Sequence, residues 1–146
     1  MIYNVKMDFT SKDRWVKDGH RTPDPEFSSY AGALSRESIC ILLTHAAMHS
    51  VPVVAADVRN AYLQAPTSEF VFIICRPEFR LDNIGNKAII TRALYSGKVE
   101  GRNLWHHLRR WMKFLGFESS RVDPGVWMKE SVRKDGVTKY YDYVLL

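Results

Sequence analysis

The chain has 146 residues, of which 46% are hydrophobic and 12% aromatic, enough to bury a core of single-domain size. Lys and Arg number 21 against 16 Asp and Glu, so the net charge of +5 is compatible with an anionic partner, although ordinary soluble proteins carry a similar excess. The apolar runs fall short of the roughly 18 residues of a membrane span, and Cys40 and Cys75 stand in apolar contexts that predict reduced core residues of an intracellular protein.

The first third of the chain predicts a hairpin, a loop and a helix. IYNVKMDF alternates as a strand does, TSKD is turn-like and RWVKDG could run back beside the first strand, which predicts a basic two-stranded ribbon. Residues 20–34 are rich in Pro, Ser and Gly and predict a loop. Ser35 is a candidate N-cap of a helix to about His49, whose apolar residues recur at helical spacing: Ile39, Leu42, Leu43, Ala46 and Ala47.

Strands and one more helix are expected in the remainder. Residues 51–57 predict a short strand buried on both faces, and residues 70–75 and 87–92 predict two further strands. VWMKES and TKYYDYVLL flank an Asp135-Gly136 turn, which predicts a hairpin with a loop longer than two residues. Residues 102–115 predict an amphipathic helix that Gly116 ends, with an apolar stripe of Leu104, Trp105, Leu108, Met112 and Leu115. Mixed helices and strands place the chain in the α+β class.

Asp57 is a candidate metal ligand. It directly follows an apolar run, where a carboxylate loses hydration unless a cation, hydrogen-bond donors or water meets it. Magnesium takes oxygen donors and usually keeps waters and substrate phosphates as its other ligands, so one carboxylate at a strand end suits it. Tyr62 would fold back over the same pocket if the intervening residues make a tight turn. An aspartate that caps loop amides is the alternative that these residues leave open.

Two histidines raise a second possibility, a zinc hydrolase. His45 and His49 stand at positions i and i+4 of the predicted helix, which is half of a zinc site. No Glu follows His45, and a third ligand at telling spacing is missing, so two histidines facing solvent are the favoured interpretation.

Several sequence blocks, in order, resemble the reverse transcriptase of copia-type long-terminal-repeat retrotransposons, an RNA-directed DNA polymerase made as part of a Gag-Pol polyprotein. The blocks are RWV (14–16), SRESICILLTHAA (35–47), AADVRNAYLQA (55–65), ALYSGK (93–98), RNLWHHL (102–108), LGF (115–117) and DPGVWMK (123–129). The resemblance covers essentially the whole chain and implies a right-hand polymerase fold, with fingers at about 1–50 and part of the palm at about 51–146. In the family an aromatic-X-Asp-Asp hairpin follows a strand like YYDYVLL, so we expect this chain to be truncated before that hairpin and inactive alone.

The resemblance also implies residue roles in magnesium-dependent deoxynucleotidyl transfer. Asp57 corresponds to the first catalytic aspartate, and Val58 would lend its backbone carbonyl to the same Mg²⁺, one of two ions in the complete enzyme. Tyr62 corresponds to the aromatic steric gate that excludes a 2′-hydroxyl by its volume. The incoming deoxynucleoside triphosphate would also be bound by Lys12, Arg14, Tyr95 and Lys98. The alternative for Lys12 and Arg14 is that they are charges on a solvated hairpin edge.

The sequence departs from the family at two places. Ser96 occupies what is usually Gly, and Val99-Glu100-Gly101 replaces the usual Gln-small-Pro, which puts fidelity or competence in doubt.

The expected partners are a template of RNA or DNA with its primer, and the integrase and RNase H segments of the polyprotein, in a cytoplasmic virus-like particle or the nucleus. On the helix at 102–115, Arg109, Arg110 and Lys113 would track the phosphate backbone, or would simply form the solvated side of an amphipathic helix, and we expect Trp105 to be core. An inactive retroelement remnant or a noncatalytic nucleic-acid-binding module is the alternative function.

Overall fold

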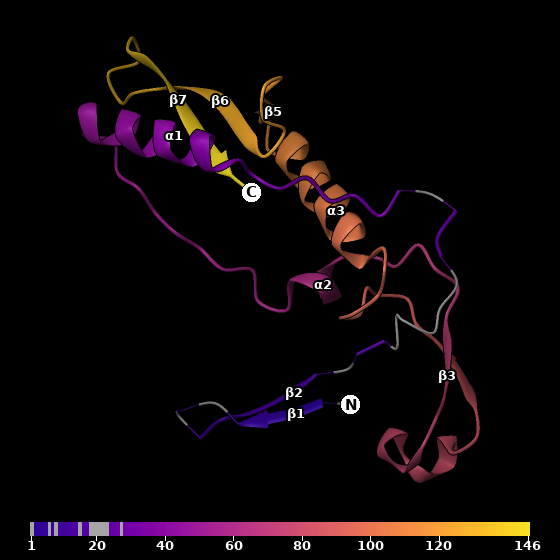
Figure 1. Ribbon diagram of the computed structural model, residues 1–146. Coiled ribbons are helices and arrows are strands. Elements are labelled where there is room, and N and C mark those ends of the chain that lie inside the picture. The colour runs from indigo at the N-terminus through magenta and orange to yellow at the C-terminus, as the bar shows by residue number, and fades with distance from the viewer. Residues whose placement is uncertain (1, 6, 8, 15, 18–23, 27) are drawn as a thin grey trace. The chain divides into compact units, whose positions relative to one another are not determined.

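A computed structural model describes residues 2–5, 7, 9–14, 16–17, 24–26 and 28–146, and for 2–4 and 12–14 it describes the backbone. The chain forms two compact units, which we describe separately (Figure 1). The first comprises Met1–Tyr30 and Arg59–His107, and the second comprises Ala31–Val58 and Leu108–Leu146. Helices and antiparallel sheets both occur in the described part of the chain, as the α+β class requires. The division into fingers and palm stays a prediction.

The first unit begins with the predicted two-stranded ribbon. The structure confirms the ribbon but places its turn elsewhere in the sequence. β1 (Ile2–Val5) pairs antiparallel with β2 (Ser11–Arg14), and Val5 lies opposite Ser11 (Figure 1). TSKD therefore contributes three residues to β2 and is not the turn. Of the predicted second strand at 14–19, Arg14 does pair with the first strand, whereas Val16 pairs with Tyr95 instead. Charged residues fit an exposed ribbon as well as a turn, so polarity alone did not locate the reversal. Residues 15, 18 and 19 of that strand lie outside the described residues.

A second hairpin follows in this unit. β3 (Phe72–Ile74) pairs antiparallel with β4 (Lys87–Ile89), which confirms both predicted strands in shorter form. Two 3-10 turns, η2 (Pro77–Phe79) and η3 (Leu81–Asn83), connect them. Gly85 ends the connection with φ of 83°, a conformation that glycine adopts without strain.

The predicted amphipathic helix is confirmed as α3 (Glu100–Phe114), which starts two residues earlier than expected and contributes residues to both units. Met112 is buried, and Gly116 follows the helix with φ of 84° as its predicted stop. Leu115, however, is 52% exposed. It lies beyond the last helical residue, so helical periodicity no longer places it on the apolar stripe.

The second unit contains the predicted capped helix. In α1 (Arg36–Met48) the Ser35 hydroxyl accepts a hydrogen bond from the Ser38 N–H at 3.1 Å, and His49 is the C-cap, which confirms both ends. Ala46 is buried, but Leu43 and Ala47 of the predicted stripe are exposed.

The sheet of this unit has the order β5 (Glu118–Ser119), β6 (Val126–Val132) and β7 (Lys139–Leu145), all antiparallel. The predicted β6–β7 hairpin is confirmed, and its loop is longer than two residues. Gly136 lies in that loop with φ of 72°. β5 was not predicted, because two residues are too short to show alternation.

Asp123 connects the start of α1 to the start of β6. Its carboxylate accepts hydrogen bonds from the Ser35 N–H and the Gly125 N–H, both at 2.9 Å. Together with the Ser38 hydroxyl, these donors hold the pKa of Asp123 well below its ordinary range. The Trp127 side chain, close to Asp123 in sequence, is fully buried and forms the centre of the unit's core.

Two sequence predictions about buried segments are wrong. Residues 51–58 have no regular secondary structure and are exposed, because an extended run becomes a strand only beside a partner and no described strand pairs with it. Cys40 is exposed on α1, since the five apolar residues of ICILL cannot all face one side of a helix, whereas Cys75 is buried as predicted. Among the described residues, none of the helices has both the length and the apolar character needed to cross a membrane.

Candidate nucleotide-binding site

A tight turn precedes Tyr62. Arg59 and Asn60 form the turn, and Asn60 adopts the left-handed conformation with φ of 51° and ψ of 44°. Asparagine tolerates this conformation better than most L-residues do. The short helix α2 (Ala61–Gln64) starts directly after it and carries Tyr62.

Backbone pairing holds the end of α2 against the ALYSGK segment of the first unit. The Ala93 N–H donates to the Ala65 carbonyl at 3.0 Å, and the Arg92 guanidinium donates to the Gln64 carbonyl at 3.0 Å. Ala65 and Ala93 are both fully buried, and their small side chains allow the two segments to approach closely. As a result the rings of Tyr62 and Tyr95 meet edge to face, with centroids 4.9 Å apart.

The chain that follows β2 reaches the same place. Val16 forms a parallel bridge with Tyr95, and the Lys17 N–H donates to the Tyr95 carbonyl at 2.8 Å. Lys12 and Arg14 lie in β2 opposite Asn4 and Ile2, and their side chains lie outside the described part of the structure. Tyr95 is therefore contacted from two other segments, by Tyr62 and by Val16 and Lys17.

Lys98 already forms an ion pair within the first unit. Its ammonium forms an ion pair with Asp24 at 2.8 Å, and Asp24 is 93% exposed. The hydrogen bond and the charge of Lys98 lower the pKa of Asp24, which shows that the pair favours the ionised carboxylate. A phosphate that binds Lys98 has to displace this carboxylate or share the ammonium with it.

Ser96 lies in the turn that the Gly97 N–H closes on the Leu94 carbonyl. Ser96 has φ of 68°, in the left-handed region that favours glycine. Glycine would adopt this conformation without the clash that a Cβ introduces. The constraint at Gly97 is one of space: a Cβ there would lie 2.4 Å from Glu100 Cγ, so a side chain would require Glu100 to shift.

Asp57 and Val58 end the exposed segment 51–58 of the second unit. The Asp57 carboxylate is accessible to a hard cation and fits part of a magnesium site, but one carboxylate cannot hold two ions. No group of three or more His, Cys, Asp or Glu side chains that could hold a metal occurs among the described residues. The two-ion site stays a prediction.

The predicted nucleic-acid face of α3 is only partly exposed. Arg110 and Lys113 are exposed, whereas Arg109 is half-buried with its guanidinium 5.9 Å from the centre of the Trp127 ring. Trp105 is half-buried beside His106, with ring centroids 5.1 Å apart, so it is less enclosed than a core residue.

The histidine pair of the zinc alternative lies on α1. The rings of His45 and His49 are 4.4 Å apart, both residues are exposed, and the Tyr143 ring lies 5.9 Å from His45. The two imidazoles are therefore neighbours on one exposed side of α1. Whether they bind zinc stays a prediction.

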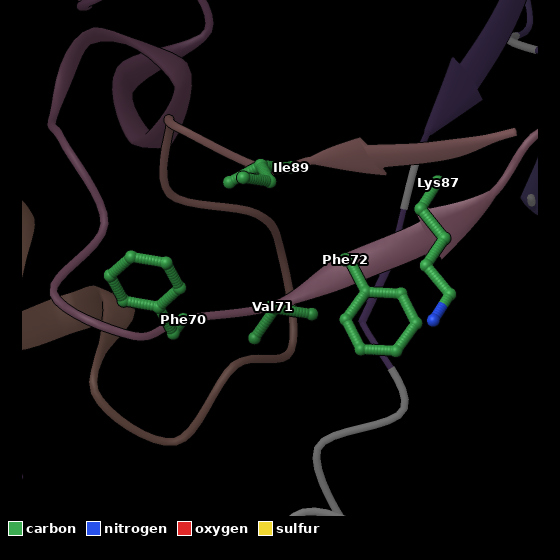
Figure 2. Close-up of a pocket in the computed structure, with 5 residues that line it drawn as sticks. All are labelled: Phe70, Val71, Phe72, Lys87 and Ile89. Atoms are coloured by element: carbon green, nitrogen blue, oxygen red, sulfur yellow. The ribbon is translucent and has the colours of Figure 1, made fainter.

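An apolar pocket of about 330 Å³ lies at the β3–β4 hairpin, away from the predicted site residues in sequence (Figure 2). Its lining consists of Phe70, Val71, Phe72, Lys87 and Ile89. Figure 2 shows the Lys87 side chain beside the Phe72 ring, with the ammonium 4.9 Å from the ring centre.

Sequence reasoning missed a buried polar network next to the candidate site. Lys17, Glu100 and Asn103 are all buried, and Glu69 and Thr67 connect them. Glu100 and Asn103 share a face of α3 by their i, i+3 spacing, which was the one signal available in advance. Lys17 and Glu69 gave no signal, because 52 positions separate them and only the fold brings them together.

Comparison of the chain with models of protein families, with curated proteins and with solved structures finds no match.

Proposed function

We propose that this chain is the fingers and part of the palm of a copia-type reverse transcriptase, and that it serves magnesium-dependent deoxynucleotidyl transfer. The observation that carries the proposal is the contact between Tyr62 and Tyr95. These residues belong to the two blocks that the resemblance assigns to the incoming nucleotide, AADVRNAYLQA and ALYSGK. The blocks are distant in sequence, and Tyr62 and Tyr95 both lie in the first unit.

The proposed reaction forms one phosphorus–oxygen bond and breaks another. The primer 3′-hydroxyl loses its proton to solvent, its oxygen attacks the α-phosphorus of the deoxynucleoside triphosphate, the bond to the bridging oxygen breaks, and pyrophosphate leaves. When bound, magnesium would lower the pKa of the primer hydroxyl and neutralise charge on the leaving group.

The chain's own residues would hold and select the nucleotide. Asp57 and the Val58 carbonyl would supply oxygen ligands, and the Tyr62 ring would lie under the sugar, where its volume leaves no room for a 2′-hydroxyl. Lys98 and the ribbon residues Lys12 and Arg14 would bind the triphosphate oxygens. Further carboxylates would come from a downstream aromatic-X-Asp-Asp segment.

Primer extension on an RNA template tests the proposal in the parent protein that carries this downstream segment. We expect Asp57→Asn to abolish DNA synthesis because the amide cannot replace an anionic ligand of magnesium. Asp82→Asn is a matched control, since Asp82 is also exposed and lies on η3, and it should retain activity. The stability of both variants toward unfolding, compared with that of the unaltered protein, checks that the fold is intact. An active Asp57→Asn enzyme would contradict the proposal.

A change of Tyr62 tests the selection step separately. Tyr62→Val should raise ribonucleotide use relative to deoxynucleotide use by roughly ten-fold to two-hundred-fold, the effect expected when a steric exclusion of this size is removed. Tyr141→Val is the control, because Tyr141 is half exposed on β7 in the other unit. Single-nucleotide extension measures the ratio, and an unchanged ratio would show that Tyr62 is not the gate.

The exposed cations Arg110 and Lys113 favour a second candidate, nucleic-acid binding without catalysis. If α3 contacts the phosphate backbone, Arg110→Ala with Lys113→Ala should reduce the slope of log affinity against log salt by about 2. The paired control, Arg121→Ala with Lys134→Ala, alters two exposed cations outside the helix and should have little effect. Binding that persists in an inactive parent protein, together with this slope change, would favour the noncatalytic function.

A further inference from the structure

A buried network of charged and polar side chains connects three segments of the first unit. Lys17 forms an ion pair with Glu69, whose backbone N–H donates to the Thr67 hydroxyl at 3.2 Å. The Thr67 hydroxyl donates to Glu100 at 3.1 Å, and the Asn103 amide donates to the other carboxylate oxygen of Glu100 at 3.0 Å. The chain after the ribbon, the loop after α2 and the start of α3 are thereby linked.

Lys17 is the cation that the described contacts of this network include, and its burial has an electrostatic cost. Loss of hydration lowers the pKa of the Lys17 ammonium, and the negative charge of Glu100 offsets part of this effect. The ion pair with Glu69 keeps the buried charge compensated. Removal of one partner from such a pair leaves an unpaired buried charge, so the geometry of the pair strongly constrains the segments that carry it.

The backbone of Lys17 reaches the candidate site. Its N–H donates to the Tyr95 carbonyl at 2.8 Å, next to the bridge between Val16 and Tyr95. The ring of Tyr95 in turn contacts the ring of Tyr62. One hydrogen bond and one ring contact therefore separate the buried ion pair from the residue that the proposed function assigns to sugar selection.

We propose that Lys17 is a positioning residue, whose ion pair with Glu69 holds Tyr95 against Tyr62 and so determines how strictly the Tyr62 ring excludes a 2′-hydroxyl. The inference rests on the proposed function of Tyr62. It assigns a role to a lysine that does not touch the nucleotide. It predicts that loss of the buried ion pair changes the preference for deoxynucleotides over ribonucleotides.

The test uses Lys17→Met in the parent polymerase, because methionine keeps much of the side-chain length and removes the charge. We expect the preference for deoxynucleotides over ribonucleotides, measured as a ratio of kcat/KM values, to fall by about ten-fold, the scale expected when a selecting group is misplaced by a fraction of an ångström. Lys139→Met is the matched control: it breaks the exposed pair with Glu130, 2.6 Å apart on the β6–β7 hairpin, and should leave the ratio unchanged.

A second variant and a direct structural measurement distinguish the proposed effect from a loss of folding. Glu69→Gln keeps the side-chain shape, weakens the same pair and should lower the ratio in the same direction. In the 146-residue chain, nuclear Overhauser contacts between the rings of Tyr62 and Tyr95 should weaken in both variants. A weakened ring contact with a lowered ratio supports the inference, whereas an unchanged ratio in a folded variant overturns it.

Failure of this inference can be told apart from failure of the proposed function. If Tyr62→Val lowers the preference for deoxynucleotides and Lys17→Met does not, Tyr62 is the gate and Lys17 does not position it. If Tyr62→Val itself leaves the preference unchanged, the proposed role of Tyr62 is wrong and the positioning role of Lys17 is wrong with it.

Discussion

Ser96 offers a prediction whose size follows from backbone geometry. The residue has φ of 68°, its side chain is exposed, and it stands between Tyr95 and Gly97 in the candidate site. A left-handed backbone brings the Cβ of an L-residue close to a neighbouring carbonyl oxygen, and glycine has no Cβ to clash. Ser96→Gly should therefore relieve strain without removing a packed side chain.

Two opposing contributions determine the expected change in the free energy of unfolding. The left-handed conformation costs an L-residue about 1–2 kcal/mol, whereas glycine loses about 0.5–1 kcal/mol more backbone entropy on folding. The difference predicts that Ser96→Gly stabilises the chain by about 1 kcal/mol. For a chain of this size that corresponds to a rise in Tm of roughly 2–4 °C.

Urea denaturation of the parent chain and the variant measures this difference. Ser29→Gly is the matched control, because Ser29 is also an exposed loop residue but has no positive φ, and it should destabilise slightly through the entropy of the unfolded chain. If Ser96→Gly lowers stability as Ser29→Gly does, the strain at Ser96 is not real and the reasoning is refuted.

Three further changes probe packing and pH dependence. Gly97→Ala places a Cβ 2.4 Å from the Cγ of Glu100, whose carboxylate is held by other side chains, and should cost about 1–3 kcal/mol of unfolding free energy, measured by urea denaturation. Trp127→Ala empties the centre of the second unit's core and should cost about 3–5 kcal/mol, and a loss below 1 kcal/mol would contradict the burial. Hydrogen bonds from the Thr138 hydroxyl and from backbone N–H groups lower the pKa of Asp135 to about 2. Because the folded-state pKa lies below the unfolded value of about 3.9, this contribution is present above that value and is lost as the pH falls toward 2, so urea midpoints of Asp135→Ala should depend less on pH in this window.

Local rules predicted much of the secondary structure. The Ser35 cap, the glycine stop at Gly116 and the turn at Asp135 and Gly136 all depend on groups a few residues apart, and the structure confirms each. The amphipathic pattern of α3 likewise predicted a helix within two residues of its observed start.

The sequence predicted which residues belong to the candidate site but not how they are arranged in space. The sequence singled out Tyr62, Tyr95 and Ser96, yet the contact of the two rings and the left-handed backbone of Ser96 came only from the structure. The interpretation of residues 51–57 as a buried strand was wrong, because a strand requires a partner that the pattern of one segment cannot supply.

By itself the sequence determined the α+β class, both ends of α1, the glycine stop after α3 and the hairpin turn, because hydrogen bonds and side-chain periodicity within a few residues dictate them. Only the tertiary structure decided that Lys17 meets Glu69, that Cys40 faces outward and that Tyr95 contacts Tyr62. Burial and ion pairing depend on which distant segments pack together, and no local pattern records that choice.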